Sequence, residues 1–111
     1  MSFQPRDYVR HILDEVDYLI ETSRGITAEA FLSDATLRRA FVRSLEIIGE
    51  ATKQLPDTFR AAHPEVDWRP MAGMRDRLIH AYFGVDYELV WEVVQVQIPQ
   101  LRQALEAILS G

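Results

Sequence analysis

Apolar residues recur at intervals of three and four positions along most of the chain, which is the period of an amphipathic helix. The clearest stripe predicts a helix over residues 5–23, formed by Val9, Ile12, Leu13, Val16, Leu19 and Ile20. A second helix is expected to begin after Asp34 and run to about Leu55, with Leu37, Phe41, Leu45, Ile48 and Ala51 on its inner face. Short helical turns are expected at 28–32 and 58–62. The residues expected to cap the helices that follow them are Thr27, Asp34, Asp67 and Asp86. Because each stripe must be buried against other helices, the pattern predicts an all-α fold.

The second half of the chain predicts two more long helices. One begins after Asp67 and ends near Gly84, with Met71, Met74, Leu78 and Ile79 facing inward. The other begins after Asp86 and contains Pro99, which lacks a backbone donor and should kink the helix. Residues 91–96 alternate as a strand does, but their flanks favour helix. The chain therefore predicts a single domain, residues 1–111, folded as an up-and-down bundle of four to five helices.

Composition excludes several classes of protein. The chain has no run of 18 apolar residues and no basic-then-apolar leader, so we expect no membrane span and no signal peptide. Cysteine is absent, which rules out disulfides and thiolate metal sites and fits a cytoplasmic protein. The net charge of −5 argues against binding nucleic acid by bulk charge, and no DNA partner is expected.

Positive charge is concentrated in the middle of the chain. Residues 38–80 carry eight Lys and Arg against six Asp and Glu, and nearly all of the cations are arginine. Arginine suits forked contacts with phosphate better than lysine does. The same arginines could equally well lie on solvent-exposed helix faces and form surface ion pairs.

One short segment gathers most of the groups that could perform chemistry. Arg75, Asp76, Arg77, His80 and Tyr82 lie within eight residues. If the helix is continuous, Asp76 lies four residues before His80 and could fix its tautomer. Arg75 and His80 would lie about 140° apart on that helix. Two copies facing each other across a two-fold axis would bring both residue types into one cleft, so we expect a homodimer with a composite site.

Histidine and arginine together suit phosphodiester chemistry. Histidine can move protons near neutral pH, and arginine can stabilise charge that develops on a phosphoryl group. RNA supplies its own nucleophile, the 2′-hydroxyl, so such a site would need no metal and no cofactor. The same cluster could instead form buried polar contacts that join helices, and the residues alone do not exclude this structural role.

At these residues the chain resembles the HepT-like branch of the HEPN superfamily. The pattern is Arg75, four residues, His80, one residue and Tyr82. The likeness extends over residues 41–51, 63–68, 73–86 and 90–92, and in all over about residues 6–108.

The resemblance implies a helical bundle that dimerises with its motif helices at the interface. It also implies a metal-independent endoribonuclease that acts as the toxin of a toxin–antitoxin pair, with a minimal nucleotidyltransferase as the antitoxin. By position, Arg75 and His80 would be the catalytic residues, and Asp76 and Arg77 would support them. Tyr82 would be the tyrosine that the partner adenylylates.

Two alternatives remain open at this stage. The chain could be a non-catalytic helical dimer that binds a nucleotidyltransferase or a nucleotide, with Arg75 and His80 as a phosphate cradle, and the acidic net charge favours this. The polar cluster could also serve only to fix the dimer register. Glu50 could be a partner of Arg75 or a surface residue.

Overall fold

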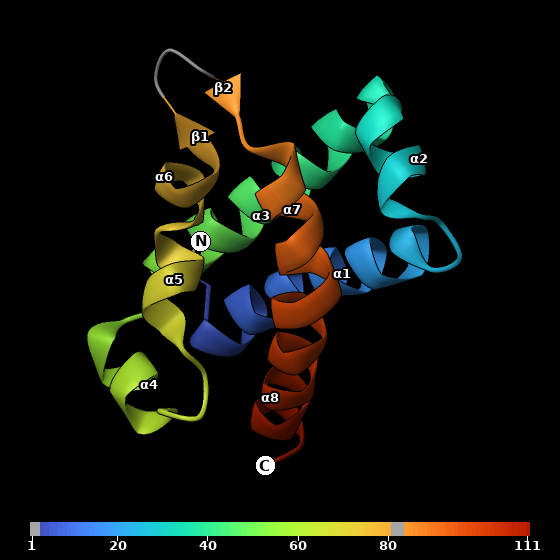
Figure 1. Ribbon diagram of the computed structural model, residues 1–111. Coiled ribbons are helices and arrows are strands. Elements are labelled where there is room, and N and C mark those ends of the chain that lie inside the picture. The colour runs from blue at the N-terminus through green and yellow to red at the C-terminus, as the bar shows by residue number, and fades with distance from the viewer. Residues whose placement is uncertain (1–2, 81–83) are drawn as a thin grey trace.

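The computed structural model describes residues 3–80 and 84–111, and most of this part of the chain is helical (Figure 1). The elements are α1 (Pro5–Ser23), α2 (Ala28–Ser33), α3 (Ala35–Gln54), α4 (Asp57–Ala62), α5 (Trp68–Ala72), α6 (Met74–Leu78), β1 (Ile79–His80), β2 (Gly84–Val85), α7 (Tyr87–Glu92), the π-helix η1 (Val93–Gln97) and α8 (Ile98–Ser110). The predicted all-α class is confirmed. No helix in these residues is both long and apolar enough to cross a membrane.

Short polar side chains begin three of the helices where the sequence predicts them. Thr27, Asp34 and Asp86 each accept a hydrogen bond, at 3.1 Å, from the backbone N–H three residues later. Each such cap stabilises its helix by about 1 kcal/mol. Asp67, the fourth expected cap, makes no side-chain hydrogen bond to α5.

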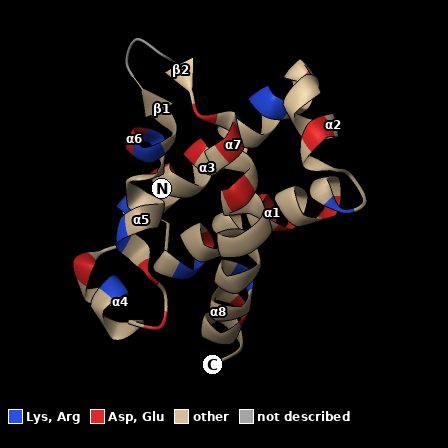
Figure 2. Ribbon diagram, in the orientation of Figure 1, with Lys and Arg blue, Asp and Glu red and all other residues tan. Residues whose placement is uncertain are grey.

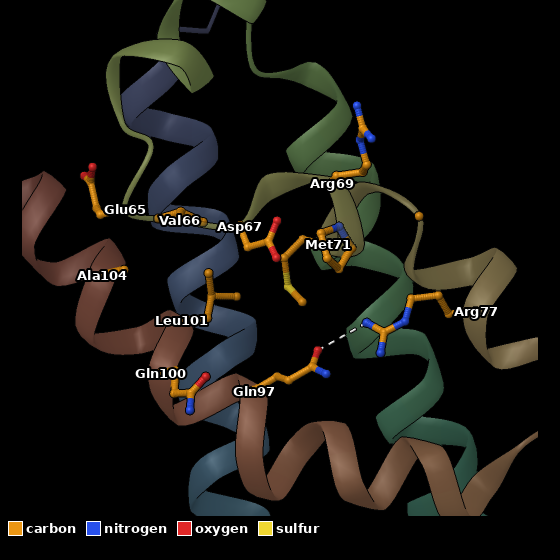
Figure 3. A pocket seen from close by; sticks show the side chains of 12 residues that line it. Glu65, Val66, Asp67, Arg69, Met71, Arg77, Gln97, Gln100, Leu101 and Ala104 are labelled. Atoms are coloured by element: carbon orange, nitrogen blue, oxygen red, sulfur yellow. Dashed lines mark hydrogen bonds between the residues drawn. The ribbon is translucent and has the colours of Figure 1, made fainter.

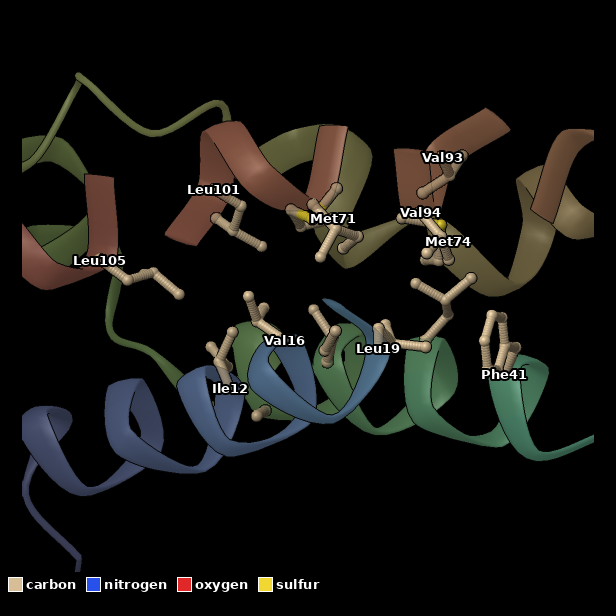
Figure 4. Packing of buried hydrophobic residues seen from close by; sticks show 14 of the residues in the cluster. Ile12, Val16, Leu19, Phe41, Met71, Met74, Val93, Val94, Leu101 and Leu105 are labelled. Atoms are coloured by element: carbon tan, nitrogen blue, oxygen red, sulfur yellow. The ribbon is translucent and has the colours of Figure 1, made fainter. Parts of the chain in front are cut away.

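The core lies where α1, α3 and the run from α7 to α8 face one another (Figure 4). Leu19, Phe41 and Leu105 are fully buried there, and burying a side chain of this size contributes about 1.5–3 kcal/mol. At the edge of the core, Arg102 of α8 donates to Asp17 of α1 over 2.7 Å. That hydrogen bond and the nearby carboxylates raise the pKa of Arg102 above its ordinary value.

The expected long helix from Asp67 to Gly84 is wrong. The chain forms two five-residue helices, α5 and α6, which meet at Gly73, and α6 ends at Leu78. Ile79 is extended and pairs with Val85 in a two-residue antiparallel ladder. Gly84, which pairs with His80, has a φ of +78°, a conformation that favours glycine. The apolar spacing fits a helix, but Ile79 is β-branched, and such residues also favour extended backbone.

Gly49 lets α5 lie close against α3. A Cβ atom built at Gly49 would stand 3.1 Å from the carbonyl oxygen of Met71, closer than such atoms normally come. A larger residue would therefore push α5 and the segment after it away from α3. This contact fixes where the residues of the motif lie relative to α3.

The last helix is irregular next to Pro99, where the sequence predicts a kink. The five residues of η1 precede α8, whose second residue is Pro99. Proline cannot donate to the carbonyl four residues before it, and its ring crowds that carbonyl, so the helix widens locally. Residues 91–96 are helical, in agreement with the choice of helix over strand.

Candidate functional site

The candidate site lies on the segment from α5 to β2, which runs along one side of the molecule (Figure 1). Its described residues, 68–80 and 84–85, are called the motif segment below. It packs on α3 through α5 and α6, and α6 also contacts α7. Acidic and basic residues alternate on α6 (Figure 2). The short helix therefore presents charges of both signs next to a well-packed core.

Arg75 turns toward α3. Its Nη1 donates a hydrogen bond of 2.8 Å to Oε2 of Glu46, and the two groups form an ion pair. The Arg75 side chain is 63% exposed and the Glu46 side chain 20%. Glu50, the other acid considered as a partner, instead lies 3.5 Å from Lys53. The guanidinium of Arg75 is thus held at one point and otherwise open to solvent.

Arg77 turns the other way. Its Nη1 donates to Oε1 of Gln97 over 3.2 Å, and this bond ties α6 to η1 (Figure 3). Arg77 and Gln97 line a hollow of about 760 Å³ between the motif segment and the α8 region. Leu101 and Met71 give this hollow an apolar part, and Asp67 adds a carboxylate. The hollow could hold a ligand with an apolar body and polar edges.

His80 lies on β1 rather than on a helix. It is exposed and pairs through its backbone with Gly84. The expected hydrogen bond between Asp76 and His80 is not present among the described contacts, because α6 ends two residues before His80. Asp76 is itself exposed. The separation of 140° between Arg75 and His80 also assumed a continuous helix, so that argument for two copies does not hold. Tyr82 lies outside the described residues.

The structure therefore shows other partners for these residues than helical spacing suggests. In the described part of the chain, no side-chain hydrogen bond or ion pair joins Arg75, Asp76, Arg77 and His80 to one another. Arg75 instead pairs with Glu46, and Arg77 with Gln97. Neither partner could be selected from helical spacing, because each lies at least 20 residues from its arginine.

The arrangement offers an exposed imidazole and an anchored guanidinium to a substrate. No group of three or more His, Asp or Glu suited to a metal ion occurs in the ranges 3–80 and 84–111. A guanidinium carries five N–H donors, so one bond to Glu46 leaves others free for an anion. An exposed imidazole can accept or release a proton near neutral pH. These groups suit an anionic substrate with an exchangeable proton.

Comparison with known proteins identifies the family. A family model described as "Ribonuclease HepT-like" matches residues 12–108, which is most of the chain. The chain belongs to the ribonuclease HepT-like family. The resemblance noted from the motif is thereby confirmed, and the HepT-like match includes both the motif segment and Glu46 on α3.

Individual relatives of the HepT-like family agree over nearly their whole length. The chain is 54% identical to a "Putative RNase" of Caldanaerobacter subterraneus subsp. tengcongensis, over 96% of this chain and 95% of that protein. It is 46% identical to a "Probable ribonuclease HepT" of Thermococcus cleftensis, over 97% of this chain and 98% of the relative. No solved structure matches the chain at a significant level.

Proposed function

We propose that the chain is a metal-independent endoribonuclease in which Arg75 and His80 act on RNA. The observation that carries this proposal is that both side chains are exposed on one short segment of a chain that belongs to the ribonuclease HepT-like family. Relatives named as ribonucleases match it from end to end, which supports the substrate class.

The reaction is an internal transesterification. The 2′-hydroxyl of RNA gives its proton to the imidazole of His80, and the 2′-oxygen forms a bond to the adjacent phosphorus. The bond from phosphorus to the 5′-oxygen breaks, and that oxygen takes up a proton from solvent. The products are a 2′,3′-cyclic phosphate end and a 5′-hydroxyl end. Arg75 stabilises the negative charge that builds on the phosphoryl oxygens.

The site is composite in this proposal, formed by two copies of the chain across a two-fold axis. The homodimer is supported by the family resemblance rather than by helical spacing. Both residues are open to solvent in one copy, as groups that meet a second copy and a substrate must be. A closed two-fold arrangement would give each dimer two arginines and two histidines.

The chain would act as the toxin of a type II toxin–antitoxin pair, with a minimal nucleotidyltransferase as the antitoxin. In the silencing step, the phenolic oxygen of Tyr82 attacks the α-phosphorus of ATP and pyrophosphate leaves. The adenylyl group adds a bulky anion two residues after His80, where it would exclude RNA. Mass spectrometry after co-expression tests this step, and an unmodified Tyr82 would contradict it.

The first test is cleavage of single-stranded RNA by the purified protein in excess chelator. His80→Ala should lower the rate by about 10²–10⁴-fold because it removes the proton acceptor. His11→Ala is the matched control, since His11 is also exposed but lies on α1. Cleavage that persists in His80→Ala at the wild-type rate would contradict the role of His80.

A second test addresses the composite site. Chains with Arg75→Ala and chains with His80→Ala are inactive alone in this proposal. Mixing them should restore part of the activity, because a mixed dimer keeps one wild-type arginine and one wild-type histidine that can act together. Mixed dimers that form but stay inactive would contradict a site shared between copies.

A second candidate function is a binding module for a nucleotide or for the nucleotidyltransferase. The observation that favours it is the hollow of about 760 Å³ beside Arg77, whose lining does not include Arg75. This reading predicts no RNA cleavage by the unmodified chain, together with saturable binding that Leu101→Trp blocks by filling the hollow. The cleavage assay separates the two functions.

A further inference from the structure

We propose that Glu46 is a positioning residue that fixes the guanidinium of Arg75 for contact with a phosphate. This inference rests on the proposed function and goes beyond it, because the motif contains no residue of α3. Its basis is the 2.8 Å ion pair from Nη1 of Arg75 to Oε2 of Glu46. The two residues are 29 positions apart in the chain, so the contact exists only in the folded protein.

Glu46 is suited to be the fixed member of the pair. Its side chain is only 20% exposed, and its neighbour Leu45 and nearby Ile48 are fully buried in the core. It lies in the middle of α3, which has 20 residues. Arg75, in contrast, is 63% exposed on a helix of five residues. The ion pair therefore joins an exposed side chain on a short helix to a largely buried side chain on a long helix.

The geometry of the pair leaves the arginine able to act. Glu46 is bonded to Nη1, while Nη2 and Nε of Arg75 take part in no other hydrogen bond in the described part of the chain. A guanidinium presents its remaining N–H groups in one plane, which matches two oxygens of a phosphate. Glu46 thus fixes one edge of the guanidinium and leaves another edge for the substrate.

The alternative role of the same contact is masking, in which Glu46 competes with the substrate for Arg75. The two roles predict opposite effects. If Glu46 positions Arg75, removing the negative charge slows the chemical step. If it masks Arg75, the same change speeds cleavage or tightens RNA binding. The open face of Arg75 favours positioning, because the phosphate need not displace Glu46.

The test is the steady-state kinetics of RNA cleavage by Glu46→Gln. This variant keeps the size of the side chain and removes its charge. We expect kcat to fall by about 10- to 100-fold with KM changed by less than about threefold, since misplacing a group affects the transition state more than substrate binding. Glu50→Gln is the matched control, because Glu50 is an exposed acid one turn along α3 that pairs with Lys53, and it should stay within about twofold of wild type.

A double-mutant cycle separates positioning from a merely structural ion pair. If Glu46 acts through Arg75, adding Glu46→Gln to an Arg75→Met chain should lower kcat no further. Thermal unfolding of each variant shows whether the fold is intact. Glu46→Asp, which keeps the charge, is measured beside Glu46→Gln, and Glu46→Ala serves as the uncharged variant if Glu46→Gln does not fold. The shorter acid should keep more of the activity than an uncharged side chain.

The outcomes are distinct. An unchanged or raised kcat in Glu46→Gln, with wild-type cleavage intact, overturns the positioning role alone. An equal further loss of kcat in the Arg75→Met background also overturns it. If the wild-type chain cleaves no RNA, the proposed function fails and this inference fails with it.

Discussion

The two sides of α6 differ although the same residue type faces each of them. On one side Arg75 pairs with a carboxylate, that of Glu46, and keeps most of its surface in solvent. On the other side Arg77 pairs with a neutral amide, that of Gln97, and is half-buried at the edge of the hollow. Two positions along a helix correspond to about 200° of rotation, which explains why the arginines point apart.

The difference shows how neighbouring arginines can have separate roles. An exposed guanidinium that is anchored at one point can still receive an anion. A half-buried guanidinium bonded to an amide of another element acts mainly to hold that element in place. In the proposed function, Arg75 therefore contacts the substrate, and Arg77 supports the motif segment against η1.

The largest expected effect comes from comparing Arg75→Met with Arg77→Met. Arg75→Met should lower the rate of RNA cleavage by about 10²–10³-fold, since it removes a donor aimed at the developing phosphoryl charge. Arg77→Met should change the rate by less than about threefold, because Arg77 does not contact the reacting atoms in this proposal. Single-turnover cleavage of one RNA by both variants, at equal fraction folded, measures the ratio.

Equal loss of activity in the two variants would contradict the separate roles of Arg75 and Arg77. Such a result would place Arg77 in the catalytic site and would require the motif segment to rearrange when RNA binds. Wild-type activity in Arg75→Met would be the more serious contradiction, because it would remove the anion-binding group on which the proposal depends.

The sequence was sufficient to predict the parts of the fold that depend on local pattern. The apolar stripes of α1 and α3 and the caps at Thr27, Asp34 and Asp86 are local, and all were confirmed. The motif segment was predicted wrongly as one helix. Its apolar spacing suits a helix, but the break at Gly73 and the pairing of Ile79 with Val85 depend on contacts that the period does not encode.

The candidate site was predictable only in its residue types. Arg75 and His80 follow from a recognisable motif, whereas Glu46 and Gln97 become partners because α6 packs on α3 and the Arg77 side chain reaches η1. Partners this far apart in the chain cannot be recognised from the helical periodicity of the sequence. Gly49 is similar, since its role depends on the backbone of α5 lying against it.

A smaller effect is expected where α5 approaches α3. Gly49→Ala would place a Cβ atom 3.1 Å from the Met71 carbonyl oxygen, and the backbone cannot yield easily. We expect the free energy of unfolding to fall by about 1–3 kcal/mol. Cleavage should slow as well, because displacing α5 also moves Arg75 away from Glu46. Urea unfolding and the cleavage assay measure the two effects.

Gly73→Ala is the control for this displacement. A Cβ atom at Gly73 would lie at an ordinary 3.5 Å from the Arg69 carbonyl oxygen, so little strain should result. If Gly49→Ala proved as stable and as active as Gly73→Ala, the contact between α5 and α3 would not be what positions Arg75. The position of α6 would then depend on the bond from Arg77 to Gln97 of η1 rather than on the contact between α5 and α3.

The smallest effect on stability is expected from changing Gln97, the partner of Arg77 on η1. Gln97→Ala removes the acceptor of the 3.2 Å bond from Arg77. The guanidinium borders an open hollow and can turn to water, so the free energy of unfolding should fall by only about 0.5–1.5 kcal/mol. Gln100→Ala, which changes another amide lining the hollow, should have still less effect.

Cleavage should stay at the wild-type rate in both variants, since neither alters the pair of Arg75 with Glu46. A loss of cleavage in Gln97→Ala without a loss of stability would mean that the η1 side also serves the reaction, because the bond from Arg77 to Gln97 would then matter for the substrate rather than for the fold.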